Sequence, residues 1–144
     1  MLSLISQMLG RSERPVCLAL GNCQITEDSG GIYLGRGLKT LGIKLIEGGL
    51  YPENRLEQVA MENPDLVILA DAVKSDTESD YIITDDLISD LTTSTHTLPL
   101  SSLASYLKIR TGSKVIFFGI NRKVAREDID NIIAKIRDAV YKSE

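Results

Sequence analysis

Three side chains in this sequence have the types and positions that chemistry needs: one imidazole and two carboxylates. His96 is the only histidine in the chain. It is therefore the sole imidazole that can titrate near neutral pH or bind a metal through nitrogen. It lies in a run of hydroxyl residues, Ser94-Thr95-His96-Thr97, just before an expected helix start at Pro99. A side chain in that position can face a ligand.

Asp28 and Asp71 are the acids that can join His96. Asp28 lies in the loop after the first expected strand, and Asp71 directly follows the third. Ligands of open α/β sheets bind beyond the carboxyl ends of the strands, so we expect all three residues at one edge of the sheet. Two carboxylates and one imidazole there would form a site for a hard or borderline divalent metal.

Each of these residues also has a purely structural interpretation. Acids near a helix start serve as caps or dipole partners. We favour that role for Glu27, and it stays open for Asp28. Asp71 would be costly if it were left unpaired beside a buried strand, but it could accept hydrogen bonds from neighbouring backbone amides. A lone histidine is more often structural than catalytic. The convergence of three candidates from separate loops is what favours a site.

The elements that position these residues follow from apolar runs that alternate with helical patterns. We expect strands at Val16–Leu20, Ile43–Ile46, Leu66–Ala70, Tyr81–Thr84 and Val115–Phe118, with an irregular loop over Val73–Asp80. We expect helices over 1–9, Gly30–Leu41, Pro52–Met61, Leu100–Leu107 and 127–142. Continuous apolar strands indicate a sheet covered on both faces. The predicted fold class is thus α/β, a three-layer sandwich with a mostly parallel, twisted sheet of five strands.

Composition narrows the class of protein. The 144 residues, 43% apolar and 25% charged, suit a single domain spanning residues 1–144. A net charge of −4 gives no basic surface for nucleic acid, and the apolar runs are too short to span a bilayer. Cys17 is expected in the core and Cys23 as a free thiol in a loop. Low cysteine use and the lack of a convincing signal segment indicate a cytoplasmic protein.

The sequence lacks several motifs that would indicate other functions, and other pairings of His96 have little support. The glycines at 30, 31, 35 and 37 do not form a dinucleotide fingerprint, and the chain has no Gly-Lys-Ser/Thr phosphate loop and no Gly-x-Ser-x-Gly elbow. Ser94 and Thr95 suggest a hydrolase triad with His96, but adjacent residues rarely orient correctly toward each other. A Cys23–His96 pair has no local signature.

An ordered set of short motifs resembles the NiFe-hydrogenase maturation endopeptidases. The motifs, spread over roughly residues 16–120, are Gly21-Asn22, Glu27-Asp28 with Gly30, Gly48-Gly49 with Pro52-Glu53-Asn54, Asp71-Ala72, and Ser94-Thr95-His96 with Leu98-Pro99-Leu100. No single motif is specific, but their order and spacing together are.

The resemblance implies an enzyme that removes a short C-terminal extension from a hydrogenase large-subunit precursor after nickel insertion. It also implies that Asp28, Asp71 and His96 act together and contact the nickel of that precursor. They would serve both as metal contacts and as the candidate catalytic residues. The nickel would arrive with the substrate, and no permanent cofactor is expected. Two acids and an imidazole fit that task, because they supply part of a coordination shell and leave positions for substrate ligands.

This sequence departs from the family pattern at three places. Ser29 follows Asp28 where the family has glycine. The segment 73–80 lacks the family's Gly and Pro-Gly, and Gly119-Ile120-Asn121-Arg122 leads almost directly to the last helix. These changes motivate an alternative, a non-catalytic metal-sensing or chaperone-like relative that docks on the precursor. A third interpretation, a small nucleotide-binding α/β domain, rests on architecture alone, and the missing phosphate loop argues against it.

Overall fold

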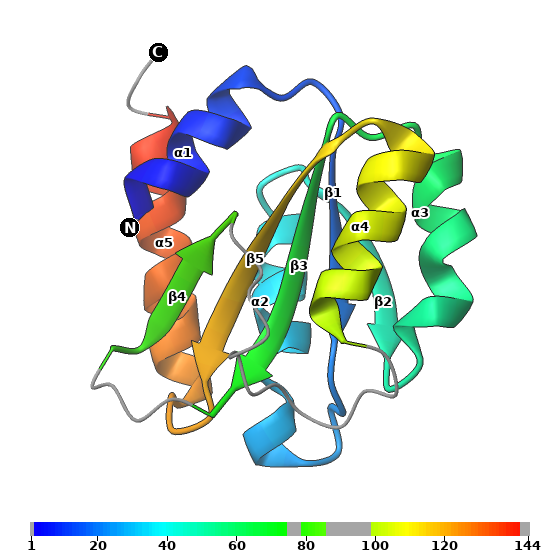
Figure 1. Cartoon of the computed structure of the whole chain (residues 1–144). Coiled ribbons are helices and arrows are strands. Elements are labelled where there is room, and N and C mark those ends of the chain that lie inside the picture. Colours follow the sequence, from blue (N-terminus) through cyan, green and yellow to red (C-terminus); the bar gives the residue numbers. More distant parts are fainter. Residues whose placement is uncertain (1, 75–78, 86–98, 142–144) are drawn as a thin grey trace.

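The computed structural model describes residues 2–74, 79–85 and 99–141 (Figure 1). The strands are β1 (Pro15–Leu20), β2 (Lys44–Gly49), β3 (Leu66–Val73), β4 (Tyr81–Thr84) and β5 (Lys114–Asn121). The helices are α1 (Leu2–Arg11), α2 (Gly30–Lys39), α3 (Leu56–Met61), α4 (Leu100–Thr111) and α5 (Arg126–Tyr141), with the short 3-10 helices η1 (Thr26–Asp28) and η2 (Pro52–Arg55).

The five strands form one sheet in the order β2-β1-β3-β5-β4. β1 pairs in parallel with both β2 and β3, β3 pairs in parallel with β5, and β4 runs antiparallel to β5 at the edge. The predicted fold class, α/β with a mostly parallel five-stranded sheet, is confirmed. The carboxyl ends of the four parallel strands share one edge, at the bottom of Figure 1.

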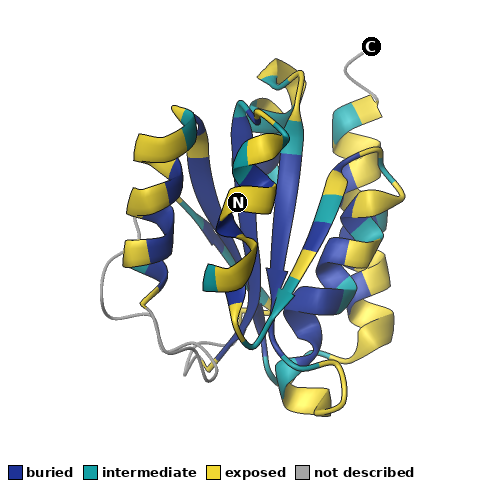
Figure 2. Cartoon of the chain, turned by 90° about the vertical axis from the view of Figure 1, so that its right-hand side faces the viewer, coloured by how far each residue is buried: buried dark blue, intermediate teal, exposed yellow. Residues whose placement is uncertain are grey.

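Helices cover both faces of this sheet, and a separate apolar core lies on each side. Residues of α1, α2 and α5, including Ile5, Leu34 and Ile136, pack on one face. Residues of α3 and α4, including Val59 and Leu103, pack on the other. Figure 2 shows the buried strands between the two helical layers. The central strands β1, β3 and β5 are buried on both faces, as their continuous apolar runs predicted.

The glycines of α2 allow close packing. A β-carbon on Gly31 would lie 2.5 Å from the Cα of Asp71, and one on Gly35 would lie 2.8 Å from the Cβ of Ala19. The first turn of α2 therefore rests directly on the ends of β1 and β3. These glycines bring helix and sheet together.

Several element boundaries differ from the prediction; for example, β2 continues to Gly49, β5 to Asn121 and α4 to Thr111. β3 continues through Val73, so Asp71 lies within the strand and not after it, because β5 pairs with all eight residues of β3. The helix expected over Pro52–Met61 is a 3-10 turn, η2, followed by α3. By contrast, Gly112 ends α4 with φ of 70°, as expected for a C-terminal cap. No helix in the described part of the chain is long and apolar enough to cross a membrane.

Candidate functional site

The candidate site lies where the strand order reverses. From β1 the chain passes to β2 on one side and then to β3 on the other, so the connections that leave the carboxyl ends of β1 and β3 diverge. In open α/β sheets such a switch point opens a crevice for ligands. Asp28 follows β1 and Asp71 lies near the end of β3. The prediction that these two acids share one edge of the sheet is confirmed.

The loop from Gly21 to Ser29 positions Asp28 through its own backbone. The amide of Asn22 donates to the carbonyl of Asp28 at 3.0 Å, and the amide of Asp28 donates to Ile25 O at 2.9 Å. The Asn22 side chain accepts from the amide of Gln24 at 2.9 Å, which is an Asx turn. Ser29, one of the departures from the family pattern, donates its hydroxyl to Thr26 O at 2.7 Å and so stabilises η1.

Asp71 is enclosed by protein. Its exposed fraction is 0%, and its Oδ1 accepts a hydrogen bond from the amide of Ala72 at 2.8 Å. The bonding of Asp71 to a neighbouring amide, which was the structural alternative, is therefore present. A functional role for Asp71 also remains consistent with its location at the switch point. Burial of a carboxyl group costs free energy, and such groups are uncommon outside functional sites.

Gly21 brings the two acids together. It has φ of +124°, and a β-carbon there would lie 2.2 Å from the carbonyl oxygen of Asp28 and 3.7 Å from Oδ1 of Asp71. Its amide donates to Gly49 O at 3.1 Å, which ties the end of β1 to the end of β2. Any side chain at position 21 would push these elements apart, so the Gly-Asn motif is a geometric requirement of the site.

Arg122 is a site neighbour that the sequence analysis did not identify. Its Nη2 lies 3.7 Å from Oδ1 of Asp28, and the side chains of Arg122 and Asp28 are 29% and 14% exposed. Its amide donates to Val73 O at 3.0 Å, which holds it beside the end of β3. The signal was its place directly after β5, at the same sheet edge as the two acids.

His96 lies outside the described residues, and so does part of the predicted 73–80 loop. Within 2–74, 79–85 and 99–141, no three His, Cys, Asp or Glu residues are grouped closely enough to hold a metal ion. Asp28 and Asp71 alone are hard oxygen donors. They fit a partial coordination shell whose other ligands come from elsewhere, and they do not form a complete resident site by themselves.

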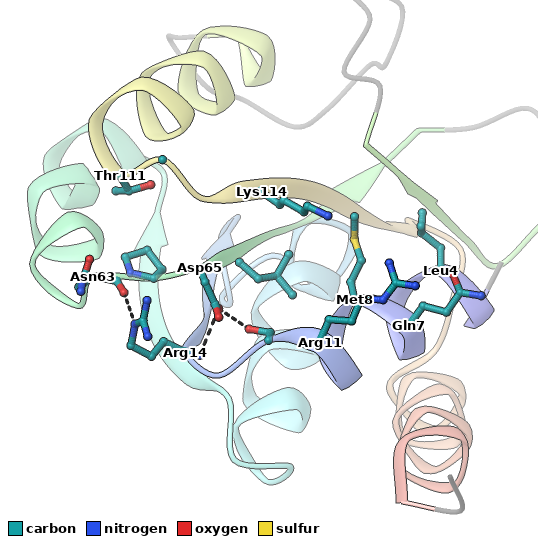
Figure 3. Close-up of a pocket in the computed structure, with 13 residues that line it drawn as sticks. Leu4, Gln7, Met8, Arg11, Arg14, Asn63, Asp65, Thr111 and Lys114 are labelled. Carbon is teal, nitrogen blue, oxygen red and sulfur yellow. Dashed lines mark hydrogen bonds between the residues drawn. The ribbon is translucent and has the colours of Figure 1, made fainter.

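A separate pocket of about 460 Å³ opens at the opposite edge of the sheet (Figure 3). It lies between α1, the start of β3 and the end of α4, and contains neither Asp28 nor Asp71. Its one acid, Asp65, accepts hydrogen bonds from the Ser12 hydroxyl and from the amides of Glu13 and Arg14. These hydrogen bonds connect the segment between α1 and β1 to the start of β3.

The chain matches known proteins over most of its length. Residues 33–143 match the family model described as hydrogenase maturation protease. A Methanocaldococcus jannaschii protein, named as a putative hydrogenase maturation protease, is 28% identical over an alignment of 137 residues, and the match covers 86% of this chain and 81% of that protein.

Solved structures agree with this match. The crystal structure of the NiFe-hydrogenase maturation protease HycI from Thermococcus kodakarensis has a TM-score of 0.78 and 27% identity, and the alignment covers 96% of this chain and 99% of that one. The solution structure of the endopeptidase HycI from Escherichia coli has a TM-score of 0.71 and 24% identity, and the alignment covers 86% of this chain and 89% of that one. The second likeness concerns the fold alone.

Proposed function

Because this chain belongs to the hydrogenase maturation protease family, we propose that it removes the C-terminal extension from the large-subunit precursor of a NiFe-hydrogenase. It is a peptidase, and we infer that it acts after nickel has been inserted into the precursor. The observation that carries the proposal is that the backbone carbonyl of Asp28 and the carboxyl group of Asp71 both lie beside Gly21, at the switch point of the sheet.

In the proposed complex, Asp28, Asp71 and His96 contact the nickel that the precursor carries. Two carboxylates and one imidazole would supply part of a coordination shell and leave positions for ligands of the precursor. Asp28 is 14% exposed, and Asp71 is fully buried, so Asp28 is the carboxylate that the substrate meets first. In this proposal the metal is part of the substrate, and the enzyme carries no permanent cofactor of its own.

The proposed reaction is hydrolysis of one peptide bond. Water adds to the scissile carbonyl carbon, the C–N bond breaks, and the proton lost by water passes to the leaving amine. A carboxylate of the site can carry that proton as a general base and then as an acid. The precursor's nickel supplies positive charge that polarises the carbonyl or the attacking water.

The test is a cleavage assay with purified precursor that carries its extension and its nickel. Mass spectrometry should show loss of the extension with the native enzyme, and no loss with Asp28→Asn, Asp71→Asn or His96→Gln. Circular dichroism should show that the three variants keep the fold. Binding of the precursor with no loss of mass by the native enzyme would instead identify a non-catalytic relative that docks on the precursor.

We place the enzyme in the cytoplasm, with the hydrogenase precursor as its partner. The two free thiols, Cys17 and Cys23, are consistent with a reducing compartment. Fractionation of cells that produce the tagged protein tests this location, and recovery in an oxidising compartment would contradict it.

A further inference from the structure

Arg122 faces the candidate site with a guanidinium that hydrogen bonds do not fully occupy. Its Nη2 lies 3.7 Å from Oδ1 of Asp28, which is an ion-pair distance and longer than a hydrogen bond. Its Nε is buried and has no hydrogen-bond partner among the described residues. The guanidinium is therefore held beside Asp28 by charge and by its backbone, and the contact is one that can be exchanged.

The backbone around Arg122 fixes where this charge sits. The amide of Arg122 bonds to Val73 O at 3.0 Å. The preceding residue, Asn121, donates from Nδ2 to Ser79 O at 3.2 Å and accepts from the amide of Lys123 at 3.2 Å. These hydrogen bonds hold the backbone that carries the Arg122 guanidinium directly at the end of β5.

A cation that binds Asp28 must compete with this guanidinium. A metal ion at the Asp28 carboxylate would lie within a few ångströms of Arg122, and the two like charges would repel each other in a partly buried setting where screening by water is incomplete. The same arginine pairs with the Asp28 carboxylate while no metal is present. The balance favours the empty site over the binding of free metal ions.

We propose that Arg122 is a positioning residue that holds Asp28 in the free enzyme and weakens the binding of free divalent cations. Asp28 then engages a metal ion only when the precursor's own ligands supply the remaining affinity. This inference rests on the proposed function, and it adds a physical reason why the enzyme would respond to nickel in the precursor and not to nickel in solution.

Titration of the purified full-length enzyme with Ni²⁺, followed by calorimetry, tests the inference without the cleavage reaction. Arg122→Gln should bind Ni²⁺ about tenfold more tightly than the native enzyme, which corresponds to ~1.4 kcal/mol. Arg122→Lys keeps the positive charge and should remain within about twofold of native. A merely structural role predicts the opposite sign, because damage to the site would weaken binding.

Two further variants locate the effect. Arg110→Gln removes the same charge from an arginine that pairs with Glu57 at 3.1 Å. Arg110 lies in the last turn of α4, before β5, whereas Arg122 follows β5. The eight residues of β5 separate the two arginines by roughly 25 Å. Arg110→Gln should therefore leave Ni²⁺ affinity unchanged. In Asp28→Asn, adding Arg122→Gln should change the affinity by less than about twofold.

Equal or weaker Ni²⁺ binding by Arg122→Gln, including no binding by either protein at millimolar metal, would overturn the inference. So would an equal gain in Arg110→Gln, which would indicate net charge alone. A native enzyme that fails to cleave the nickel-loaded precursor would refute the proposed function, while the metal titration would still report on Arg122. The two claims can therefore fail separately.

Discussion

Asp71 has a carboxyl group that the protein encloses completely, so it offers a direct single-residue test of the site. Asp71→Asn keeps the shape and the acceptor for the Ala72 amide but removes the carboxyl group. We expect the rate of precursor cleavage to fall by on the order of 100-fold or more. We also expect a melting temperature near native, because asparagine keeps the acceptor for the Ala72 amide.

The control for this variant is Asp130→Asn, which removes an exposed carboxylate from α5. It should leave both the cleavage rate and the melting temperature near native. A large loss of stability in Asp71→Asn with full activity per folded molecule would show that Asp71 serves only the fold.

Gly21 lies against the backbone of Asp28 and close to the carboxyl group of Asp71. Gly21→Ala should lower the free energy of unfolding by roughly 2–3 kcal/mol, because φ of +124° is strained for alanine and its Cβ would lie 2.2 Å from Asp28 O. Gly112→Ala separates the two causes, since φ there is +70° with nothing within 4 Å. It should cost only about 1 kcal/mol. Urea unfolding measures both, and equal costs would contradict the close contact at Gly21.

From the sequence it could be predicted that Asp28 and Asp71 are candidate site residues at one edge of the sheet. The contacts that other side chains make with them could not be predicted. Their placement followed from the predicted strand ends alone. It holds although the third strand was predicted to end at Ala70, whereas β3 continues through Val73 and includes Asp71. The place of Arg122 directly after β5 indicated its sheet edge, but its ion pair with Asp28 was missed because such a pair depends on side-chain reach across elements. The prediction for His96 stays a prediction, because that residue lies outside the described chain.

At the scale of elements, Asp65 joins the α1–β1 link to the start of β3. Burial acts to raise the pKa of Asp65, but the hydrogen bonds from the Ser12 hydroxyl and the amides of Glu13 and Arg14 outweigh it and lower the pKa. A lowered pKa in the folded state means that the stabilisation is present above the unfolded value of about 3.9. It is lost as the pH falls through the lowered value.

Asp65→Asn should therefore reduce the free energy of unfolding by about 1 kcal/mol at pH 7. The difference from native should disappear once the pH falls below the lowered pKa of Asp65 in the folded protein, because the native carboxyl is then also protonated. Urea unfolding at a series of pH values checks this. A difference that is constant with pH would show that the loss comes from packing and not from charge.

Element types were predictable because each strand and helix carries its own period, whereas their ends depend on partners. β3 extends to Val73 because β5 offers backbone partners as far as Asn121. η2 and α3 divide one helical pattern because Pro52 begins it with a 3-10 turn against Gly48, whose added β-carbon would lie 3.1 Å from Pro52 Cα. Neither partner can be seen from local sequence.

At the scale of the whole molecule, the two thiols report on the integrity of the fold. Cys17 is buried and Cys23 exposed, as expected, and burial raises the pKa of the Cys17 thiol to about 12. At pH 8 a thiol reagent should therefore modify Cys23 rapidly and leave Cys17 untouched until the protein is denatured. Rapid modification of both cysteines in the native protein would contradict the buried β1.

The strand order is the property of the whole molecule that turns separate motifs into a site. Alternating apolar and helical segments predicted a parallel sheet covered on both faces, but the order β2-β1-β3-β5-β4 depends on long-range pairing. That order places the switch point between β1 and β3. Asp28 and Asp71 are therefore neighbours, although β2 and α3 separate them in the sequence.

The most direct test of the central claim compares one precursor in two states, loaded with nickel and free of it, under otherwise identical conditions. We predict that the enzyme shortens only the nickel-loaded precursor, and that mass spectrometry detects loss of the C-terminal extension in that sample alone. Equal cleavage of both forms would contradict recognition of the metal through Asp28, Asp71 and His96. Cleavage of neither form would contradict the proposed activity itself.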